Sequence, residues 1–401
     1  MIEAGSLQFW RATLALCIGS FMIFANVYIT QPLLPMLQQE FQISTLQAGW
    51  SFTITTLTLG ISLLFFGPLS DVLGRRGLML LSMAGVTCIT LLLGFVDNYW
   101  LLLLLRGLQG FFLAGLPAIA IAYMGDEYSR KALLLAVGLY ISGNTLGGIS
   151  GRLIGGFVGD WLGWSAAFQA MGLISLCCVM LFALLLPGSK RFLQQPLHPG
   201  TMLLALWNHL QNPLLLLVYL IGGFNFFIFI NQYSYITFVL AAEPFSLSAS
   251  WLGMLFVTYL SGTFGSAISG KLAQRFGPLP CIAAGIVILM LGSCVTLMAD
   301  LTAIVVGFFL NSFGFFFAHS TASSWVSRHA MHSKASASSL YLAFYYLGAS
   351  SGSFYLDPFW QFHGWSGVIA GSLLVLCGTL LATLLLFKYD RVRHLEAMEQ
   401  P

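Results

Sequence analysis

Residues 143–156 read GNTLGGISGRLIGG and place a single arginine, Arg152, among six glycines in an otherwise apolar stretch. Rows of small residues four positions apart are typical of helices that approach each other closely in a lipid bilayer. A charged side chain in such a stretch is costly unless it has a partner, reaches water or has a function. The stretch therefore predicts a membrane helix, and its arginine is a candidate functional residue.

The composition of the whole chain agrees with a membrane helix at this position. Hydrophobic residues make up 58% of the 401 positions and charged residues only 7%, which is too little charge for the surface of a soluble protein. A span needs about 20 apolar residues. We expect the first span to be retained, because it is too long for a signal peptide and lacks a small-residue cleavage pattern. Twelve segments are long enough: 12–34, 47–68, 77–96, 99–122, 132–156, 164–186, 213–238, 250–270, 280–299, 301–323, 336–358 and 366–387.

The charges predict the orientation of these spans. Of the 16 Lys and Arg residues, Arg106 and Arg152 lie within spans, and the other 14 fall on one side if twelve spans are threaded in order. By the positive-inside rule that side, with both termini, is cytoplasmic. The outer loops then carry one acid each: Glu40, Asp97, Asp160, Glu243, Asp300 and Asp357. The net charge of +3 therefore reflects topology and does not indicate nucleic-acid binding.

The chain repeats itself at an offset near 201. Gln31 recurs as Gln232, and the tripeptide that begins at Gly163 recurs at Gly364. We expect an all-α polytopic fold of two related six-helix bundles, residues 1–186 and 213–401, joined by a cytoplasmic linker, 187–212, that contains Lys190, Arg191 and His198. Parallel repeats with a central site are typical of alternating-access transporters.

Residues 67–76, GPLSDVLGRR, resemble the signature between helices 2 and 3 of the major facilitator superfamily. Gly67 would permit close helix approach and Gly74 a tight turn. Asp71 is expected at the N-terminal end of the next helix, where it offsets the helix dipole and meets a basic partner. Arg75 and Arg76 would hold the loop at the cytoplasmic surface. The resemblance implies a latch between alternating states, whereas a charged turn that only sets topology is the alternative.

Helix 4 carries RGLQG, with Arg106, Gln109 and Gly110. The pattern resembles the Arg-x-x-Gln-Gly signature of drug/proton antiporters, in which the arginine is associated with proton transfer. Arginine stays protonated, so Arg106 could tune a proton carrier or bind an anion but not carry the proton itself. A hydrogen-bonding hub to neighbouring helix carbonyls is the alternative.

The opening stretch resembles the helix 5 signature of the same antiporters, except that Arg152 stands where the signature has proline. Arg152 lies near the outer end of its helix, where it could reach the interface or pair with Asp160. Segments such as YITQPLLPML and FGFFFAHSTASSW resemble the YnfM-type branch of bacterial efflux transporters over essentially the whole chain. The glycines that match the helix 5 signature are Gly138, Gly147, Gly151, Gly155 and Gly156.

Helices 1, 4, 7 and 10 line the central cavity in that superfamily. Transmembrane amides and hydroxyls also join helices to one another, so each such residue has both interpretations. The candidate cavity residues are Asn26, Tyr28, Gln31, Asn225, Gln232, Asn311 and His319.

Span interiors are expected to contain no Asp or Glu, while both embedded arginines are cationic. This balance favours a neutral or anionic substrate over a lipophilic cation. His319 is the span residue that titrates near neutral pH, so it is the candidate proton carrier, with Asp71 as the edge alternative. A neutral His319 bonded to a helix 11 hydroxyl would instead be structural.

The sequence thus predicts a monomeric secondary transporter of the bacterial inner membrane that exports a small organic solute in exchange for protons. Proton-coupled uptake of an anionic metabolite and a non-transporting membrane sensor remain alternatives. An intramembrane enzyme is disfavoured because metalloprotease, serine-hydrolase and phosphate-loop patterns are missing. We expect no metal, cofactor or nucleic acid.

Overall fold

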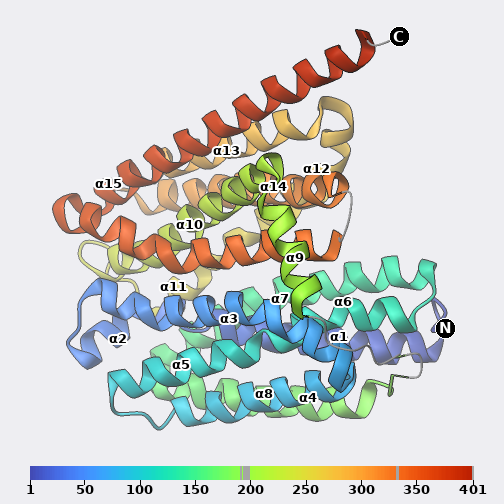
Figure 1. Cartoon of the computed structure of the whole chain (residues 1–401). Helices are drawn as coiled ribbons and strands as arrows, with labels where there is room; N and C mark the ends of the chain where they lie inside the picture. The colour runs from blue at the N-terminus through green and yellow to red at the C-terminus, as the bar shows by residue number, and fades with distance from the viewer. Residues whose placement is uncertain (190–191, 193–198, 331–333, 400–401) are drawn as a thin grey trace. The chain divides into compact units, whose positions relative to one another are not determined.

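The computed structural model describes residues 1–189, 192, 199–330 and 334–399, and its regular elements in these ranges are helices (Figure 1). The first part of the chain contains α1 (Leu7–Tyr28), η1 (Gln31–Leu33), α2 (Leu34–Phe41), α3 (Thr45–Leu73), α4 (Arg75–Leu93), α5 (Tyr99–Leu113), α6 (Gly115–Glu127), α7 (Arg130–Leu162) and α8 (Trp164–Leu185). The remainder contains α9 (Pro199–Leu210), α10 (Pro213–Ala241), α11 (Ala249–Leu255), η2 (Phe256–Thr258), α12 (Tyr259–Phe276), α13 (Pro278–Val295), α14 (Leu301–His329) and α15 (Lys334–Glu399).

Eleven helical segments among the described residues are long and apolar enough to cross a membrane. The last of them, Ser336–Lys388, is interrupted by non-helical backbone at Gly364, with φ 55° and ψ −136°. Counted as two helices on either side of this glycine, it brings the total to the twelve spans expected from the sequence. The all-helical polytopic fold is confirmed.

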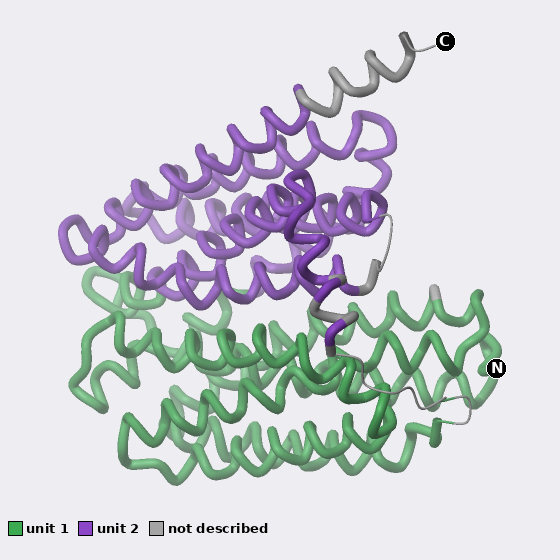
Figure 2. Tube along the Cα trace, in the orientation of Figure 1, with its two compact units in different colours: residues 1–198, 237–256 green, residues 199–236, 257–401 purple. Residues whose placement is uncertain are grey.

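The described chain forms two compact units (Figure 2). Unit 1 comprises residues 1–198 and 237–256, and unit 2 comprises residues 199–236 and 257–401. The division into bundles 1–186 and 213–401 stays a prediction. Within the predicted linker, α9 occupies Pro199–Leu210, whereas Lys190, Arg191 and His198 lie outside the described residues.

Single glycines make the shortest connections between helices. Gly74 is the whole link between α3 and α4 and has φ 94°, a region that side chains with a Cβ rarely adopt. Gly277 makes the same link between α12 and α13 with φ 88°. The two glycines are 203 positions apart, so the sequence repeat is also a repeat of backbone conformation.

Helix α7 packs against α1 through its glycines. A Cβ on Gly147 would lie 2.3 Å from the carbonyl oxygen of Phe21, and a Cβ on Gly151 would lie 2.3 Å from that of Ala25. Gly155 continues the row one turn later against Ile29. Any side chain in this row would push the helices apart, so the predicted small-residue face holds the backbones in direct contact.

In unit 2, α13 and α14 cross in the same way. Gly285 faces the carbonyl oxygen of Gly314 at 2.7 Å from an ideal Cβ, and Gly314 faces that of Gly285 at 2.6 Å. Gly292 and Gly307 repeat this reciprocal contact two turns away. Each unit therefore contains a pair of helices whose backbones pack in direct contact through glycines.

Candidate functional site

The predicted latch residues gather at the junction of α3, α4 and α6 in unit 1. An Arg75 terminal nitrogen lies 3.0 Å from a carboxylate oxygen of Asp71, and its Nε lies 2.5 Å from Asp126. Asp71 lies in the last turn of α3, so its expected placement at the start of the next helix is wrong. The sequence DVL after Ser70 simply continues the helix as far as Gly74, which supplies the turn.

Arg76 and Gly67, the other two motif residues, take no part in the ion pairs of Arg75. Arg76 donates hydrogen bonds to the carbonyls of Ala183 and Leu186, at 2.7 and 3.0 Å, and so caps the end of α8. A Cβ on Gly67 would have its nearest neighbour 4.0 Å away, at the Ala118 carbonyl, so no close helix approach occurs there in this structure.

Arg106 on α5 is fully buried and joins three helices. It donates to the carbonyls of Ser51 on α3 (3.0 Å) and of Asn26 and Val27 on α1 (3.2 and 3.3 Å). A further bond of 2.5 Å reaches Oε1 of Gln109. Four of the five N–H groups of a guanidinium are therefore used, which is the geometry of the hydrogen-bonding hub considered as the alternative for this residue.

A network of neutral polar groups surrounds that hub. Gln109 Nε2 donates to Thr90 Oγ1 at 2.7 Å, and Thr90 donates to Asn26 Oδ1 at 2.7 Å. Asn26 in turn donates to Ser175 on α8 at 2.8 Å. Gly110 lets α5 touch α3, since a Cβ there would lie 2.3 Å from the Thr55 carbonyl. Asn26 therefore ties helices together here.

Arg152 on α7 is also fully buried, but its surroundings are of another kind. Its Nε donates to Gln31 Oε1 at 2.8 Å and a terminal nitrogen donates to the Gly148 carbonyl at 2.8 Å. The guanidinium carbon lies 3.9 Å from the ring centroid of Tyr28 and 4.4 Å from that of Phe256. Two candidate cavity residues, Tyr28 and Gln31, thus meet at this cation.

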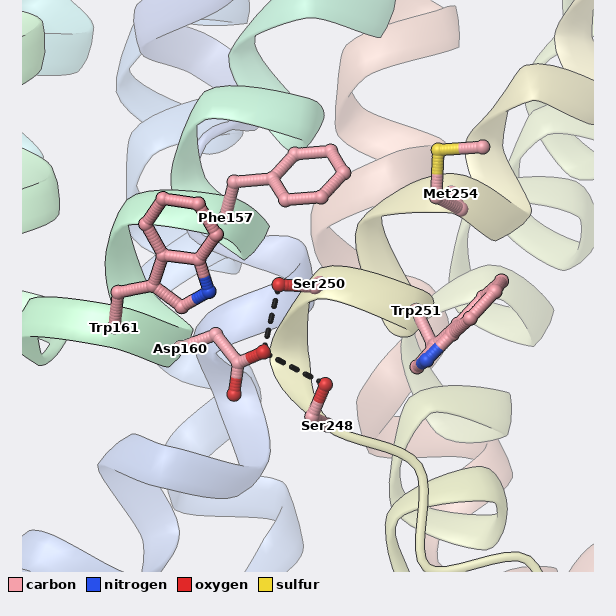
Figure 3. Close-up of a pocket in the computed structure, with 7 residues that line it drawn as sticks. All are labelled: Phe157, Asp160, Trp161, Ser248, Ser250, Trp251 and Met254. Carbon is pink, nitrogen blue, oxygen red and sulfur yellow. Dashed lines mark hydrogen bonds between the residues drawn. The ribbon is translucent and has the colours of Figure 1, made fainter.

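Of the two contacts considered for Arg152, the ion pair with Asp160 is not among those of the described residues, and the fully buried side chain does not reach the interface either. Side chains on a helix lean toward its N-terminus, and Arg152 reaches back to Gly148 rather than forward. Asp160 lies two turns further on and accepts hydrogen bonds from Ser248 Oγ at 2.8 Å and Ser250 Oγ at 2.7 Å (Figure 3).

Helix α7 also meets α11 within unit 1. A Cβ on Gly156 would lie 2.5 Å from the Ala249 carbonyl oxygen, and a Cβ on Gly253 would lie 2.7 Å from that of Arg152. Phe256, which follows α11, supplies the second aromatic ring beside the Arg152 guanidinium. The contact therefore encloses the cation at the predicted outer end of the helix.

Unit 2 contains a counterpart of the neutral network. Gln232 Oε1 accepts hydrogen bonds from Asn311 Nδ2 at 2.6 Å and from Ser293 Oγ at 3.1 Å. Ser293 stands 203 positions after Thr90, and Asn311 stands 202 after Gln109. Asn225 is bonded separately to Thr379, at 2.8 Å. These three candidate cavity residues therefore also join helices.

The arginine hub has no charged counterpart in that network. Position 308, which is 202 after Arg106, is occupied by Phe308. The Tyr233 hydroxyl donates to the Phe308 carbonyl at 3.2 Å and shares a 2.6 Å hydrogen bond with Thr258. Thr258 stands 203 after Thr55, whose hydroxyl donates to the Arg106 carbonyl at 3.1 Å. A tyrosine thus links the helices at a place where the first copy uses an arginine.

His319 on α14 lies in an aromatic cluster of unit 2. Its Nδ1 and the Tyr341 hydroxyl on α15 are 3.0 Å apart. The Phe315 ring stacks on the imidazole with centroids 5.6 Å apart, and the Tyr345 ring lies at 4.8 Å. The histidine thus contacts a hydroxyl of the predicted helix 11, an arrangement compatible with either of its interpretations.

Sequence reasoning missed Asp357. It was expected in an outer loop, but α15 stays helical up to the break at Gly364, and only 6% of Asp357 is exposed. Its carboxylate accepts a 2.5 Å hydrogen bond from Gln361. The signal that could have found it is the Gly-Trp-Ser repeat, since Gly163 already marks a turn of one glycine in the first copy.

Among the described residues, no group of three or more His, Cys, Asp or Glu side chains is placed to hold a metal ion. Residues 16–353 match the family described as the Major Facilitator Superfamily. The chain belongs to this superfamily. It is therefore a multi-pass membrane transporter rather than an enzyme, and the family implies a small-molecule substrate.

Two relatives and one solved structure are informative. The inner membrane transport protein YnfM of Escherichia coli (strain K12) is 37% identical over 95% of this chain and 91% of its own length, which confirms the YnfM-type resemblance. The multidrug resistance protein MdtG of Proteus mirabilis (strain HI4320) is 32% identical over 42% of this chain and 43% of MdtG. A mutant form of the nucleoside transporter NupG shares the fold, with a TM-score of 0.74, 15% identity, and coverage of 94% of this chain and 99% of that chain.

Proposed function

We propose that this transporter exports a small neutral or anionic organic solute across the bacterial inner membrane in exchange for protons. The observation that carries the proposal is the chemistry around Arg152. A buried cation that contacts two aromatic rings and an amide repels cationic solutes and attracts anionic or electron-rich ones. The Tyr28 and Phe256 rings beside Arg152 supply the flat apolar surface that an organic solute would contact.

The export direction rests on two similarities. The helix 4 and helix 5 patterns resemble those of drug/proton antiporters, and MdtG, which matches part of the chain, is named a multidrug resistance protein. The inner membrane is the location named for YnfM. Both termini are placed in the cytoplasm by the positive-inside rule, and we expect a monomer.

For proton coupling we assign His319 as the carrier. Its bond to the Tyr341 hydroxyl supplies a route by which a proton could reach or leave the imidazole. Asp71 is held in an ion pair with Arg75, so we assign it to the latch instead. Asp357 is a second carrier candidate, because a covered carboxylate in a membrane helix is a functional hypothesis by default.

The latch acts through charge pairing at the α3–α4 turn. Arg75 bridges Asp71 and Asp126 on two different helices, so a movement of α6 relative to α3 has to break one of its ion pairs. We propose that this exchange of partners accompanies the alternation between states.

A flux measurement tests the function. Cells that overproduce the protein and cells that lack it are compared in a screen of metabolites and toxicants, and each hit is then measured in proteoliposomes. An imposed pH gradient should drive uphill movement of the hit, and His319→Gln should remove the dependence of the rate on pH. Downhill flux that ignores the gradient would contradict proton coupling, and absence of any flux would favour a non-transporting sensor.

The same Arg152 environment is compatible with uptake of an anionic metabolite. The two directions are separated by the sign of the gradient that drives accumulation. In exchange, protons enter while the solute leaves. In uptake, the solute and the proton enter together.

A further inference from the structure

A groove of about 330 Å³ opens in unit 1 where the end of α7 meets the start of α11 (Figure 3). Figure 3 shows Asp160 and its two serine partners at the centre, with Trp161 and Trp251 on opposite sides of them. The full lining is Phe157, Asp160, Trp161, Ser248, Ser250, Trp251 and Met254. The groove therefore combines one carboxylate with a mostly apolar and aromatic wall.

Two tryptophans indicate that the groove lies near the lipid headgroups. Trp161 is in the last turn of one candidate span and Trp251 in the first turn of another. Their side chains are 79% and 63% exposed, and exposed tryptophans at span ends are typical of the interface between bilayer and water. Whatever fills the groove in the membrane is therefore a molecule of that interface.

The charge of the lining indicates which molecule this is. Asp160 is the one charged residue among the seven that line the groove. Its Oδ2 accepts both serine hydrogen bonds, and the structure gives Oδ1 no hydrogen bond within its described residues. An acceptor oxygen with a negative charge, flanked by two indole rings, is complementary to an ammonium group that can donate hydrogen bonds.

We propose that this groove binds the primary ammonium headgroup of a phospholipid, such as phosphatidylethanolamine. The ammonium donates to Asp160 Oδ1 and lies against the Trp161 and Trp251 rings. The acyl chains follow the apolar side chains of Phe157 and Met254 along the outside of unit 1. The proposal does not rest on the direction of transport or on proton coupling.

The bound lipid would also affect the contact between α7 and α11. Both walls are needed to form it, because Asp160 belongs to α7 and its serine partners flank or begin α11. A headgroup seated there favours the arrangement in which the two helices touch. The composition of the leaflet would then affect how readily α7 and α11 separate.

Native mass spectrometry of the purified full chain tests the site, with phosphatidylethanolamine and phosphatidylcholine as defined probes. Phosphatidylethanolamine should bind to the wild type more tightly than phosphatidylcholine, whose quaternary ammonium cannot donate a hydrogen bond. Asp160→Asn keeps an acceptor for the serines and removes the charge, so it should weaken phosphatidylethanolamine binding roughly tenfold. Trp161→Leu keeps an apolar wall and should weaken it about threefold.

Asp97→Asn is the matched control, because Asp97 is an exposed acid that is likewise predicted to lie on the outer side. It should leave lipid binding unchanged. Equal binding of the two lipids by the wild type would overturn the proposal even if the Asp160 variant failed to fold. Equal losses in the Asp160 and Asp97 variants would also overturn it, as would a dimer mass in place of a lipid-bound monomer.

Discussion

Two of the arginines that the structure describes in unit 1 are fully buried, and their contacts differ in kind. Arg106 gives its hydrogen bonds to the carbonyls of Ser51, Asn26 and Val27 and to Gln109. The contacts of Arg152 include the Gln31 amide, the Gly148 carbonyl and the rings of Tyr28 and Phe256. Three of the four Arg106 hydrogen bonds end on backbone carbonyls of other helices and are fixed with those helices. Arg152 also contacts the side chains of Tyr28, Gln31 and Phe256, which can exchange their contacts. This difference is the basis for the roles we propose, a structural one for Arg106 and a substrate-binding one for Arg152.

The repeat supports the structural assignment of Arg106. Unit 2 builds the same kind of polar network with Phe308 at the matching position and Tyr233 as the connecting hydroxyl. Because one copy joins its helices without a charge, the arginine is one of two solutions to the same packing requirement. Arg152 has Ser353 at the matching offset of 201, so neither buried arginine has a cationic equivalent in the second copy.

The largest expected effect is on folding. Arg106→Gln leaves buried carbonyls on α1 and α3 without donors, at a cost of about 1–3 kcal/mol for each. We expect a large fall in the thermal unfolding temperature and in the yield of monodisperse protein. Arg11→Gln, at an exposed arginine, is the control and should change neither. A wild-type unfolding temperature for Arg106→Gln would remove the distinction between the two arginines.

The next effect is on binding. Arg152→Gln removes the cation while its neighbours can still pack, so the protein should fold and its apparent substrate constant should rise roughly tenfold or more. Arg152→Lys keeps the charge but loses the flat face that lies against Tyr28, and should give an intermediate value. Transport kinetics on a hit from the solute screen provide the measurement. Unchanged kinetics for the Gln variant would contradict the binding role.

A third change tests the glycine row beside Arg152. Gly151→Ala places a Cβ against the Ala25 carbonyl and should destabilise the protein by about 1–3 kcal/mol through overpacking. Gly138→Ala is on the same helix with nothing within 4 Å of the added Cβ, and should stabilise it by up to about 1 kcal/mol. Equal shifts in unfolding temperature for the two variants would mean that the close approach of α7 and α1 is not needed.

The smallest effect on stability concerns Arg75, whose side chain is 12% exposed and which forms the ion pairs of the latch. Asp71→Asn breaks an ion pair whose carboxylate is 43% exposed, so the loss of stability should be no more than about 1 kcal/mol. As a latch residue, Asp71 should affect the turnover rate more than the apparent Michaelis constant for the substrate. Identical turnover in the wild type and the variant would exclude Asp71 from the mechanism.

Much of the fold was predictable because the periodicity of apolar residues and the sidedness of charge act along the whole chain. The twelve spans and the membrane class follow from such patterns, whereas the superfamily was indicated by the resemblance of the GPLSDVLGRR and RGLQG motifs. The hub at Arg106 was foreseen only as an alternative, since a sequence does not say whether carbonyls of α1 and α3 lie within reach. The partners of Arg106 are 51 or more positions away in the chain, except Gln109.

The errors have a common physical cause, which is the length of the helices. Asp71, Asp160 and Asp357 were each assigned to a loop or a helix start, and each lies inside a helix that ends later at a glycine. The apolar periodicity fades before the backbone turns, so the end of a hydrophobic run is a poor guide to the end of a helix. The direction of the Arg152 side chain could have been predicted, because helical side chains lean toward the N-terminus.

The contact between α7 and α1 has a mechanical consequence. Gly147, Gly151 and Gly155 meet backbone atoms of α1 directly, so no interlocked rotamers have to be released when one helix shifts along the other. Closely interdigitated side chains resist shear, because each must leave its hole before it can enter the next. A contact without side chains instead allows α7 to slide along α1. Arg152 is next to this contact and would move with α7.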